Sequence, residues 1–164
     1  MAASVLLDTS FLITLVKSTR PNHPIAAQYY RLMLEQQIPM YFSAIAASEF
    51  AIKQPVTDLP IKNFRTVPFN IPHSIEAARL WNALKRDNGD NRAVVHDDVK
   101  MMAQAAHESI PFILTEDAST LYKYCERMRM AGEMRVRAIK LIDGFDSSVF
   151  REDGQRGLSL EPAN

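Results

Sequence analysis

The chain contains a single cysteine, Cys125, among its 164 residues. A lone cysteine excludes an intramolecular disulfide framework and a zinc site built from several cysteines. Long apolar runs are also missing, since no stretch reaches the roughly 18 residues that a membrane-spanning helix needs. The first residues lack the basic and apolar regions of a secretory signal peptide. We therefore expect a cytoplasmic protein that does not associate with membranes.

An excess of charge of one sign is absent as well, because 19 Lys and Arg residues balance 19 Asp and Glu residues. Proteins that hold nucleic acid by bulk attraction are usually basic, so a broad binding surface of that kind is not expected. A local imbalance occurs in segment 123–140, where bases outnumber acids. This segment is either a solvated helix face or a patch that faces phosphate, in which Arg129 and Arg135 are the candidate contacts.

Apolar residues make up 47% of the chain and charged residues 23%, which is ordinary for one folded domain. Short apolar runs predict buried strands at 4–7, 40–43, 112–114 and 136–142. Amphipathic stretches predict helices at 9–17, 25–37, 44–54, 74–86, 96–109 and 118–130. Strands that alternate with helices indicate an α/β fold, with a small, mainly parallel sheet of four or five strands. We assign residues 1–150 to this domain and predict a loose C-terminal tail at 151–164.

Two acids occupy equivalent places in this pattern. Asp8 and Asp117 each follow an apolar strand and precede a helix. The carboxyl ends of parallel strands form the crevice in which such sheets bind ligands. An acid at this junction is also a common helix N-cap, so both alternatives stay open for each residue taken alone.

Two further acids, Glu49 and Asp98, lie on the faces of their helices that should turn inward. Helical spacing places Glu49 on a stripe with Ile52, and Asp98 on a methionine- and alanine-rich stripe. A buried carboxylate without a partner is costly and has to be neutralised or paired. One alternative is therefore a structural ion pair, with Lys53 beside Glu49 and Lys100 beside Asp98.

The four acids together predict a shared site. Carboxylates that converge on one crevice repel each other unless they are protonated or bridged by a cation. A site made only of carboxylate oxygens favours a hard cation, Mg²⁺ or Mn²⁺. Such cations support hydrolysis of phosphodiesters. Helical spacing favours Asp98 over its neighbour Asp97 for this site, because the positions three, four and seven residues beyond Asp98 are all apolar.

The motifs around these acids resemble those of PIN-domain ribonucleases. The resemblance covers residues 4–142 and is carried by Val5-Leu6-Leu7-Asp8-Thr9-Ser10, Ser48-Glu49, Asp98-Val99-Lys100-Met101-Met102-Ala103-Gln104-Ala105 and Phe112-Ile113-Leu114-Thr115-Glu116-Asp117. The nearest branch is the VapC-type toxins of bacterial toxin–antitoxin pairs. The resemblance implies a three-layer α/β/α fold, endoribonuclease activity that depends on Mg²⁺ or Mn²⁺, a homodimer and an antitoxin protein as partner.

The same resemblance assigns roles to residues. The acids implied to be catalytic and to hold the metal are Asp8, Glu49, Asp98 and Asp117. The hydroxyl groups implied to support them belong to Thr9, Ser10 and Thr115. The candidate contacts to an RNA substrate are Arg129, Arg135, Lys53 and Lys100.

Two other functions fit parts of the pattern. One is a non-catalytic PIN-fold module that binds RNA or protein, against which the presence of all four acids argues. The other is a phosphoacceptor signalling domain, which needs an aspartate at the end of a central strand. Thr115 and Lys140 would have to serve that domain as well, but we expect none of the aspartates to end a central strand.

Overall fold

Five parallel strands form one sheet in the computed structural model of the chain, which describes residues 2–151. The strands are β1 (Val5–Leu7), β2 (Met40–Ser43), β3 (Phe64–Val67), β4 (Phe112–Thr115) and β5 (Arg137–Lys140). Their order across the sheet is β3-β2-β1-β4-β5. This confirms the expected α/β class and the small parallel sheet. The predicted tail lies, apart from Arg151, outside the described residues, so the proposed domain boundary stays a prediction.

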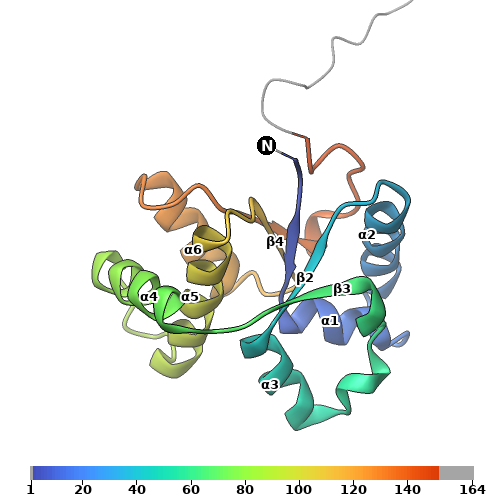
Figure 1. Cartoon of the computed structure of the whole chain (residues 1–164), viewed down its shortest axis with the longest axis horizontal. Helices are drawn as coiled ribbons and strands as arrows, with labels where there is room; N and C mark the ends of the chain where they lie inside the picture. The colour runs from blue at the N-terminus through green and yellow to red at the C-terminus, as the bar shows by residue number, and fades with distance from the viewer. Residues whose placement is uncertain (1, 152–164) are drawn as a thin grey trace, which may run out of the picture.

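Six helices complete the described part of the fold. They are α1 (Thr9–Val16), α2 (His23–Glu35), α3 (Ala44–Lys53), α4 (Ile71–Ala83), α5 (Arg92–His107) and α6 (Leu121–Met130). In Figure 1, α2 lies on one side of the strands and α4, α5 and α6 lie on the other, while α1 and α3 lie below the ends at which the strands finish. The protein therefore has three layers. Within residues 2–151, no helix is long and apolar enough to cross a membrane.

The middle strand, β1, explains why so short an apolar run forms a strand at all. Its three residues are fully buried, and it pairs with β2 on one side and β4 on the other. A strand covered on both faces by helices needs apolar side chains at every position, and an alternating pattern would fail. The register places Leu7 beside Leu114, so the residues that follow β1 and β4 emerge side by side.

Two helices begin three or four residues earlier than the sequence pattern predicts, and α2 begins two residues earlier. Helix α4 starts at Ile71 instead of residue 74, because Pro72 fits within a first helical turn, where its missing N–H is not needed. Helix α5 starts at Arg92 instead of residue 96, because the side chain of Asn91 accepts hydrogen bonds from the first free backbone N–H groups. The prediction for the second start was wrong by a full turn, since the loop-like composition before it contains the cap.

Helix α5 is fixed to the sheet by apolar packing and by one buried polar side chain. Met101 and Met102 are buried on its inward stripe, as the spacing predicts. Gln104 is also fully buried, and its side-chain nitrogen donates to the carbonyls of Val67 (3.3 Å) and Pro68 (3.0 Å). The hydroxyl of Ser43 donates to the side-chain oxygen of the same glutamine. These bonds attach α5 to the carboxyl ends of β2 and β3.

Candidate active site

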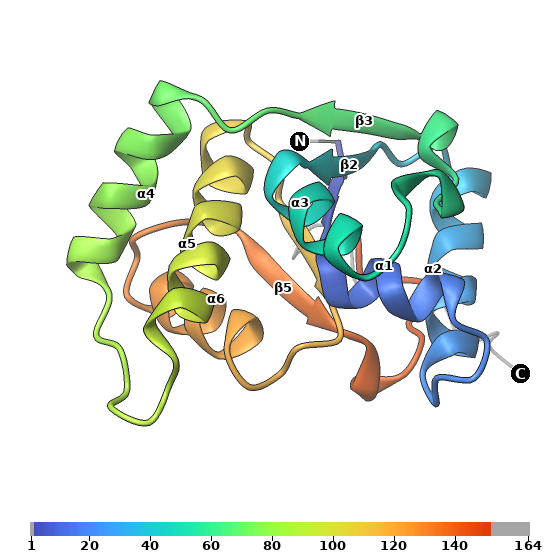
Figure 2. The same cartoon turned by 90° about the horizontal axis from the view of Figure 1, so that it is seen from below.

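A cavity of about 430 Å³ lies at the end of the sheet where the strands finish. Figure 2 looks onto the molecule from this direction, with α1, α3 and α5 in view. The four acids singled out in the sequence all line this cavity, although they come from four separate segments: Asp8, Glu49, Asp98 and Asp117. The structure thus brings together the residues that the sequence pattern grouped. Thr9 and Ser10 line the same cavity.

Asp8 stands at the N-cap position of α1, but its side chain makes no capping hydrogen bond. Its Oδ2 instead accepts hydrogen bonds from the hydroxyls of Ser10 (2.6 Å) and Thr115 (2.8 Å). Burial raises the pKa of the Asp8 carboxyl, which these two hydrogen bonds and one from the backbone of Thr9 oppose, and repulsion by Asp117 raises it further. The sequence left a cap or a crevice as alternatives, and the side chain of Asp8 serves the crevice.

Glu49 reaches the cavity from α3. The hydroxyl of Thr9 donates to its Oε2 at 2.6 Å. Burial raises the pKa of Glu49, and the charges of Asp8 and Asp97 raise it further. The stripe expected beside it was wrong in one respect, because Ile52 is 84% exposed and lines the cavity from the solvent side. The buried face of α3 is instead built around residues such as Phe50.

Asp98 has the most unfavourable environment of the four acids. Its Oδ2 is buried and, within the described part of the chain, has no hydrogen-bond partner. Burial raises the pKa of Asp98 to about 8, and the charges of Asp8, Asp117 and Glu49 add to the effect. A carboxyl in this state at neutral pH is either protonated or neutralised by something that the protein chain does not supply.

Asp117 combines both roles that the sequence left open. Its Oδ1 accepts hydrogen bonds from the backbone N–H groups of Ser119 (2.8 Å) and Thr120 (3.0 Å), which organises the turn before α6. The hydroxyl of Thr120 donates to the other oxygen at 2.6 Å. Burial opposes ionisation, but the hydrogen bonds from these two residues lower the pKa of Asp117. Asp117 therefore supplies a negative charge to the cavity at neutral pH.

These acids fit a hard divalent cation. Three of the four carboxyls have raised pKa values, because burial and mutual repulsion disfavour their charged forms. A cation among them would remove both penalties and would give the unpartnered oxygen of Asp98 a ligand role. Carboxylate oxygens are the donors that Mg²⁺ and Mn²⁺ prefer, and among residues 2–151 neither sulfur nor imidazole lines this cavity.

The two lysines expected beside the acids have different roles. Lys100 pairs with Asp97 at 3.0 Å and not with Asp98, so the alternative of an Asp98–Lys100 ion pair is wrong. Lys53 lines the cavity, and its charge lowers the pKa of Glu49, an effect smaller than that of burial. Lysine side chains therefore leave the acid cluster incompletely neutralised.

A second group of possible metal ligands lies at the other end of α5. Donor atoms of His73, His107 and Glu108 lie within 4.8 Å of one another. However, Nδ1 of His73 accepts a hydrogen bond from the backbone N–H of Asn70, so its proton sits on Nε2 and is donated to Glu108 at 2.7 Å. A protonated nitrogen cannot bind a metal. We interpret this group as a structural contact that links α4 to the end of α5 and is separate from the carboxylate cavity.

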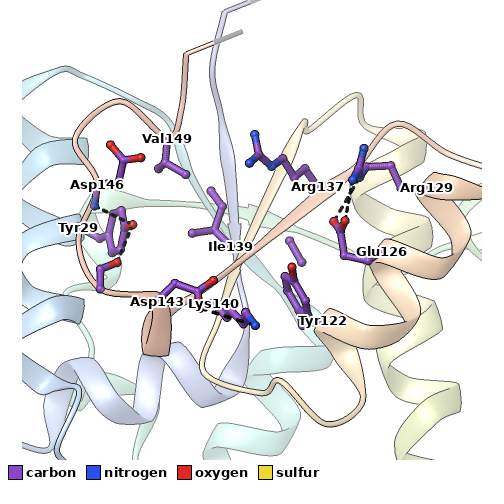
Figure 3. A pocket seen from close by; sticks show the side chains of 12 residues that line it. Tyr29, Tyr122, Glu126, Arg129, Arg137, Ile139, Lys140, Asp143, Asp146 and Val149 are labelled. Carbon is purple, nitrogen blue, oxygen red and sulfur yellow. Dashed lines mark hydrogen bonds and ion pairs between the residues drawn. The ribbon is translucent and has the colours of Figure 1, made fainter. Parts of the chain in front are cut away.

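The bases of segment 123–140 lie away from the carboxylate cavity. Figure 3 shows a different cavity, of about 360 Å³, beside β5, with Arg129 and Lys140 in its wall. There Arg129 pairs with Glu126 at 2.6 Å and Lys140 pairs with Asp143 at 3.6 Å. Arg135 is exposed and lines neither of these two cavities. RNA contacts by Arg129 and Arg135 therefore remain predictions, without support from their position.

Two further bases of this segment hold a loop in place. Arg127 forms a two-bonded pair with Asp87 (3.0 and 3.1 Å), and Lys123 donates to the same carboxylate at 3.0 Å. Hydrogen bonds from Arg127 and then Lys123 lower the pKa of Asp87 to about 2. The loop between α4 and α5 is thus attached to α6, and these charges serve the fold.

The position of Asp8 bears on the phosphoacceptor alternative. Asp8 directly follows β1, the middle strand of the sheet, so the expectation that no aspartate ends a central strand was wrong. The lysine considered for that function, Lys140, nevertheless does not line the cavity, because it lies over the ring of Tyr122 and beside Asp143. The geometry therefore does not support a phosphoacceptor site.

Two residues of the cavity region escaped the sequence pattern. Arg20 lines the cavity, and its guanidinium donates to Glu116 at 2.6 Å. Glu116 also accepts from the side chains of Asn22 (3.1 Å) and Thr14. Nothing in the spacing of the sequence points to Arg20, because it lies in a turn and has no helical or strand periodicity. Glu116 lies between Thr115 and Asp117, and the sequence pattern assigned no role to it.

The sheet order, the three layers and the acids at the carboxyl end of β1 define an α/β/α fold of the PIN-like type. Two solved structures with this arrangement resemble the chain over most of its length. One is VapBC2 from Rickettsia felis bound to a DNA fragment from its promoter, with a TM-score of 0.53 and 10% identity, covering 83% of this chain and 97% of that chain. The other is DNA-bound VapBC from Salmonella typhimurium, with a TM-score of 0.53 and 13% identity, covering 85% of this chain and 98% of that chain.

The likeness is structural. No family model matches the chain, and no curated protein matches it either. At 10% and 13% identity, the two VapBC structures show that the fold is shared. The fold expected from the motifs around the four acids is thereby confirmed, and the activity has to be argued from the site.

Proposed function

We propose that the protein is an endoribonuclease that depends on Mg²⁺ or Mn²⁺ and acts as the toxin of a toxin–antitoxin pair. The observation that carries the activity is the state of Asp98. A buried oxygen without a partner, in a carboxyl whose pKa is about 8, is unfavourable for the fold of the protein alone. Strained groups of this kind cluster at functional sites, where a ligand relieves them.

The carboxylates would hold the cation, with Asp8, Glu49, Asp98 and Asp117 as ligands. When bound, the cation supplies charge neutralisation and a water activated for attack on phosphorus. The hydroxyls of Ser10 and Thr115 hold the carboxylate of Asp8, which lines the cavity, in one orientation. The carboxylates would also orient the attacking water, and departure of the 3′ oxygen would give products with 5′-phosphate and 3′-hydroxyl ends.

A cleavage assay tests this proposal directly. Labelled single-stranded RNA of mixed sequence is incubated with the protein in Mg²⁺, in Mn²⁺ and in EDTA. We expect cleavage in either metal and none in EDTA, and a loss of at least about 100-fold in the Asp8→Asn variant. The Asp58→Asn variant is the matched control, because Asp58 is exposed in the short 3₁₀ helix Val56–Asp58 and does not line the cavity.

The toxin role rests on the fold and on what the similar structures contain. Both are VapBC assemblies, and both are bound to DNA. An antitoxin partner and a homodimer belong to the same proposal. Production of the protein alone in a bacterium should arrest growth, while the Asp8→Asn variant should not. If the wild type and the Asp8→Asn variant arrest growth equally, the arrest does not depend on the site and the toxin proposal fails.

The competing function is a PIN-fold module that binds RNA or protein without cleaving it. All four acids are present and face one cavity, which favours the enzyme. RNA binding in the first assay without cleavage in any metal would establish the module instead.

A further inference from the structure

Arg20 is an unusual neighbour for a cavity lined by acids. It lies in the turn between α1 and α2, where the backbone N–H of Arg20 donates to the carbonyl of Lys17. Its side chain is 36% exposed and lines the same cavity as Asp8 and Asp117. A long cation in this place would ordinarily fold onto the nearest carboxylates of the cavity. It pairs instead with Glu116, which does not line the cavity.

Glu116 holds the guanidinium by one edge. Nη1 of Arg20 donates to Glu116 at 2.6 Å and to the hydroxyl of Thr14 at 3.3 Å. Glu116 is itself fixed, because the side chains of Asn22 and Thr14 also donate to it. Within residues 2–151, Nε and Nη2 of Arg20 make no hydrogen bond. A guanidinium has five N–H donors, so a second edge stays available for a ligand.

The charges around the cavity indicate what the free edge of the guanidinium could bind. Five carboxylates line the cavity, against the two bases Arg20 and Lys53. A phosphodiester that approaches such a site is repelled until it meets a cation. The guanidinium fork matches two phosphate oxygens, and such charge-assisted pairs are stronger than neutral hydrogen bonds. Of these two bases, Arg20 is the one whose side chain makes hydrogen bonds within residues 2–151.

We propose that Arg20 forms a phosphate-binding subsite at the rim of the carboxylate cavity, which takes a backbone phosphate next to the one that is cleaved. Glu116 is its positioning residue, because it keeps the guanidinium from collapsing onto Asp117 and its neighbours. The subsite rests on the proposed nuclease function and names a part of its substrate contact. Its ligand is the ribose–phosphate backbone, irrespective of base sequence.

The test measures binding without cleavage. A short, fluorescein-labelled single-stranded RNA of mixed sequence is titrated with protein in EDTA across a range of NaCl concentrations. We expect Arg20→Ala to weaken binding roughly tenfold and to reduce the slope of log K against log salt by about 0.7, the value for one lost phosphate contact. Arg20→Lys should keep the slope and lose part of the affinity, because it retains the charge without the fork.

Arg31→Ala is the matched control, since Arg31 is an exposed arginine of α2 that does not line the cavity. It removes the same charge and should leave both affinity and slope unchanged. Equal binding by Arg20→Ala, Arg31→Ala and the wild type overturns the subsite, as does a wild type that fails to bind RNA at any salt concentration.

Glu116→Gln tests the positioning role by the sign of its effect. Removal of a negative charge near an RNA site should tighten binding if Glu116 acts only through its charge. A positioning role predicts weaker binding, because Arg20 is then free to pair with the cavity acids. Tighter binding by this variant overturns the role of Glu116.

Cleavage in Mn²⁺ separates this inference from the proposed function. Arg20→Ala should raise KM with little change in kcat, because it contacts substrate away from the reacting atoms. If the wild type binds RNA through Arg20 but cleaves nothing, the subsite stands and the nuclease proposal fails. If the wild type cleaves and Arg20→Ala matches it in KM and in binding, the subsite fails alone.

Discussion

The adjacent aspartates of α5, Asp97 and Asp98, show how much one position along a helix changes the chemistry of a carboxyl. Both line the carboxylate cavity. The side chain of Asp97 is 42% exposed and pairs with Lys100, whereas Asp98 keeps a buried oxygen without a partner. The 100° rotation between them is what separates a rim residue from a central one.

The raised pKa of Asp98 predicts how the free energy of unfolding depends on pH when EDTA keeps metal ions away. Its pKa is about 8 in the folded state, against 3.8 for the ordinary group. Between these values the folded state holds a proton that the unfolded state has released, so the stability falls as the pH rises. Asp98→Asn removes this proton uptake. The stability advantage of the variant over the wild type should therefore widen by about 1.4 kcal/mol per pH unit, or roughly 4 kcal/mol between pH 5 and pH 8.

Urea denaturation at several pH values measures this difference. Asp97→Asn is the control, and its stability should follow the wild-type pH trend. A constant gap between Asp98→Asn and the wild type at every pH would show that the carboxyl of Asp98 is charged throughout, contrary to the prediction.

The same pair of variants separates the two acids in catalysis. Asp98→Asn removes a central carboxylate and should lower the rate of RNA cleavage by at least about 100-fold in saturating Mg²⁺. Asp97→Asn should reduce it only a few-fold, because this side chain is held at the rim by Lys100. The measurement is the single-turnover rate of each variant. A dead Asp97→Asn enzyme beside an active Asp98→Asn enzyme would reverse the assignment.

At the scale of single residues, the sequence was informative where periodicity exists. Asp98 was predicted to face inward because its helical neighbours are apolar, and Met101 and Met102 are indeed buried. Arg20 had no such signal, because a turn gives each side chain its own direction. Its partner Glu116 is distant in sequence, so only the folded chain shows that the two meet.

At the scale of elements, the position of α5 depends on Gln104. This buried amide bridges α5 to the ends of β2 and β3 through Ser43, Val67 and Pro68. Asp98 lies on the same helix, six residues earlier. Gln104 stands within an apolar run, so the sequence indicates that it is buried. Its hydrogen-bond partners lie at least 36 residues earlier in the chain, and only the folded structure shows them.

We expect Gln104→Ala to destabilise the protein by roughly 2 kcal/mol, because it leaves the buried carbonyl of Val67 and the buried hydroxyl of Ser43 without their partner and removes the bond to Pro68. The measurement is the free energy of unfolding from urea denaturation. Gln28→Ala, in an exposed position of α2, is the matched control and should change stability by less than about 0.5 kcal/mol. A loss in the Gln104 variant no larger than in the control would mean that water replaces the amide.

The ends of the elements were harder to predict than their existence. Strands β1, β2 and β4 were predicted correctly because short apolar runs that are buried, apart from the half-buried Tyr41 of β2, have few other solutions. The starts of α4 and α5 were missed because a proline and an asparagine, which usually signal a loop, act there as a first-turn residue and a cap. Composition does not distinguish these uses, since the difference lies in backbone hydrogen bonds.

At the scale of the whole molecule, the site belongs to the folded state alone. Its acids come from segments that start at residue 8 and end at residue 117, so an unfolded chain does not assemble them. A ligand that binds only the folded state stabilises it. We therefore expect Mn²⁺ at a hundred times its dissociation constant to add about 2.7 kcal/mol to the stability of the wild type.

Thermal denaturation with and without Mn²⁺ measures this effect. Asp8→Asn and Asp98→Asn should lose most of the metal-induced rise in Tm, while Asp58→Asn should keep it. A rise that survives in both cavity variants would place the metal elsewhere in the protein.

The middle place of β1 in the sheet also sets when the site is finished during protein synthesis. β1 is made first, yet one of its two neighbours is β4, which ends at Thr115. At about 5–20 residues per second, a ribosome takes roughly 6–23 s to reach Asp117. Until then the growing chain carries Asp8 without the strand that positions it. A protein proposed to cut RNA therefore cannot complete its site before at least the first 117 residues have been made.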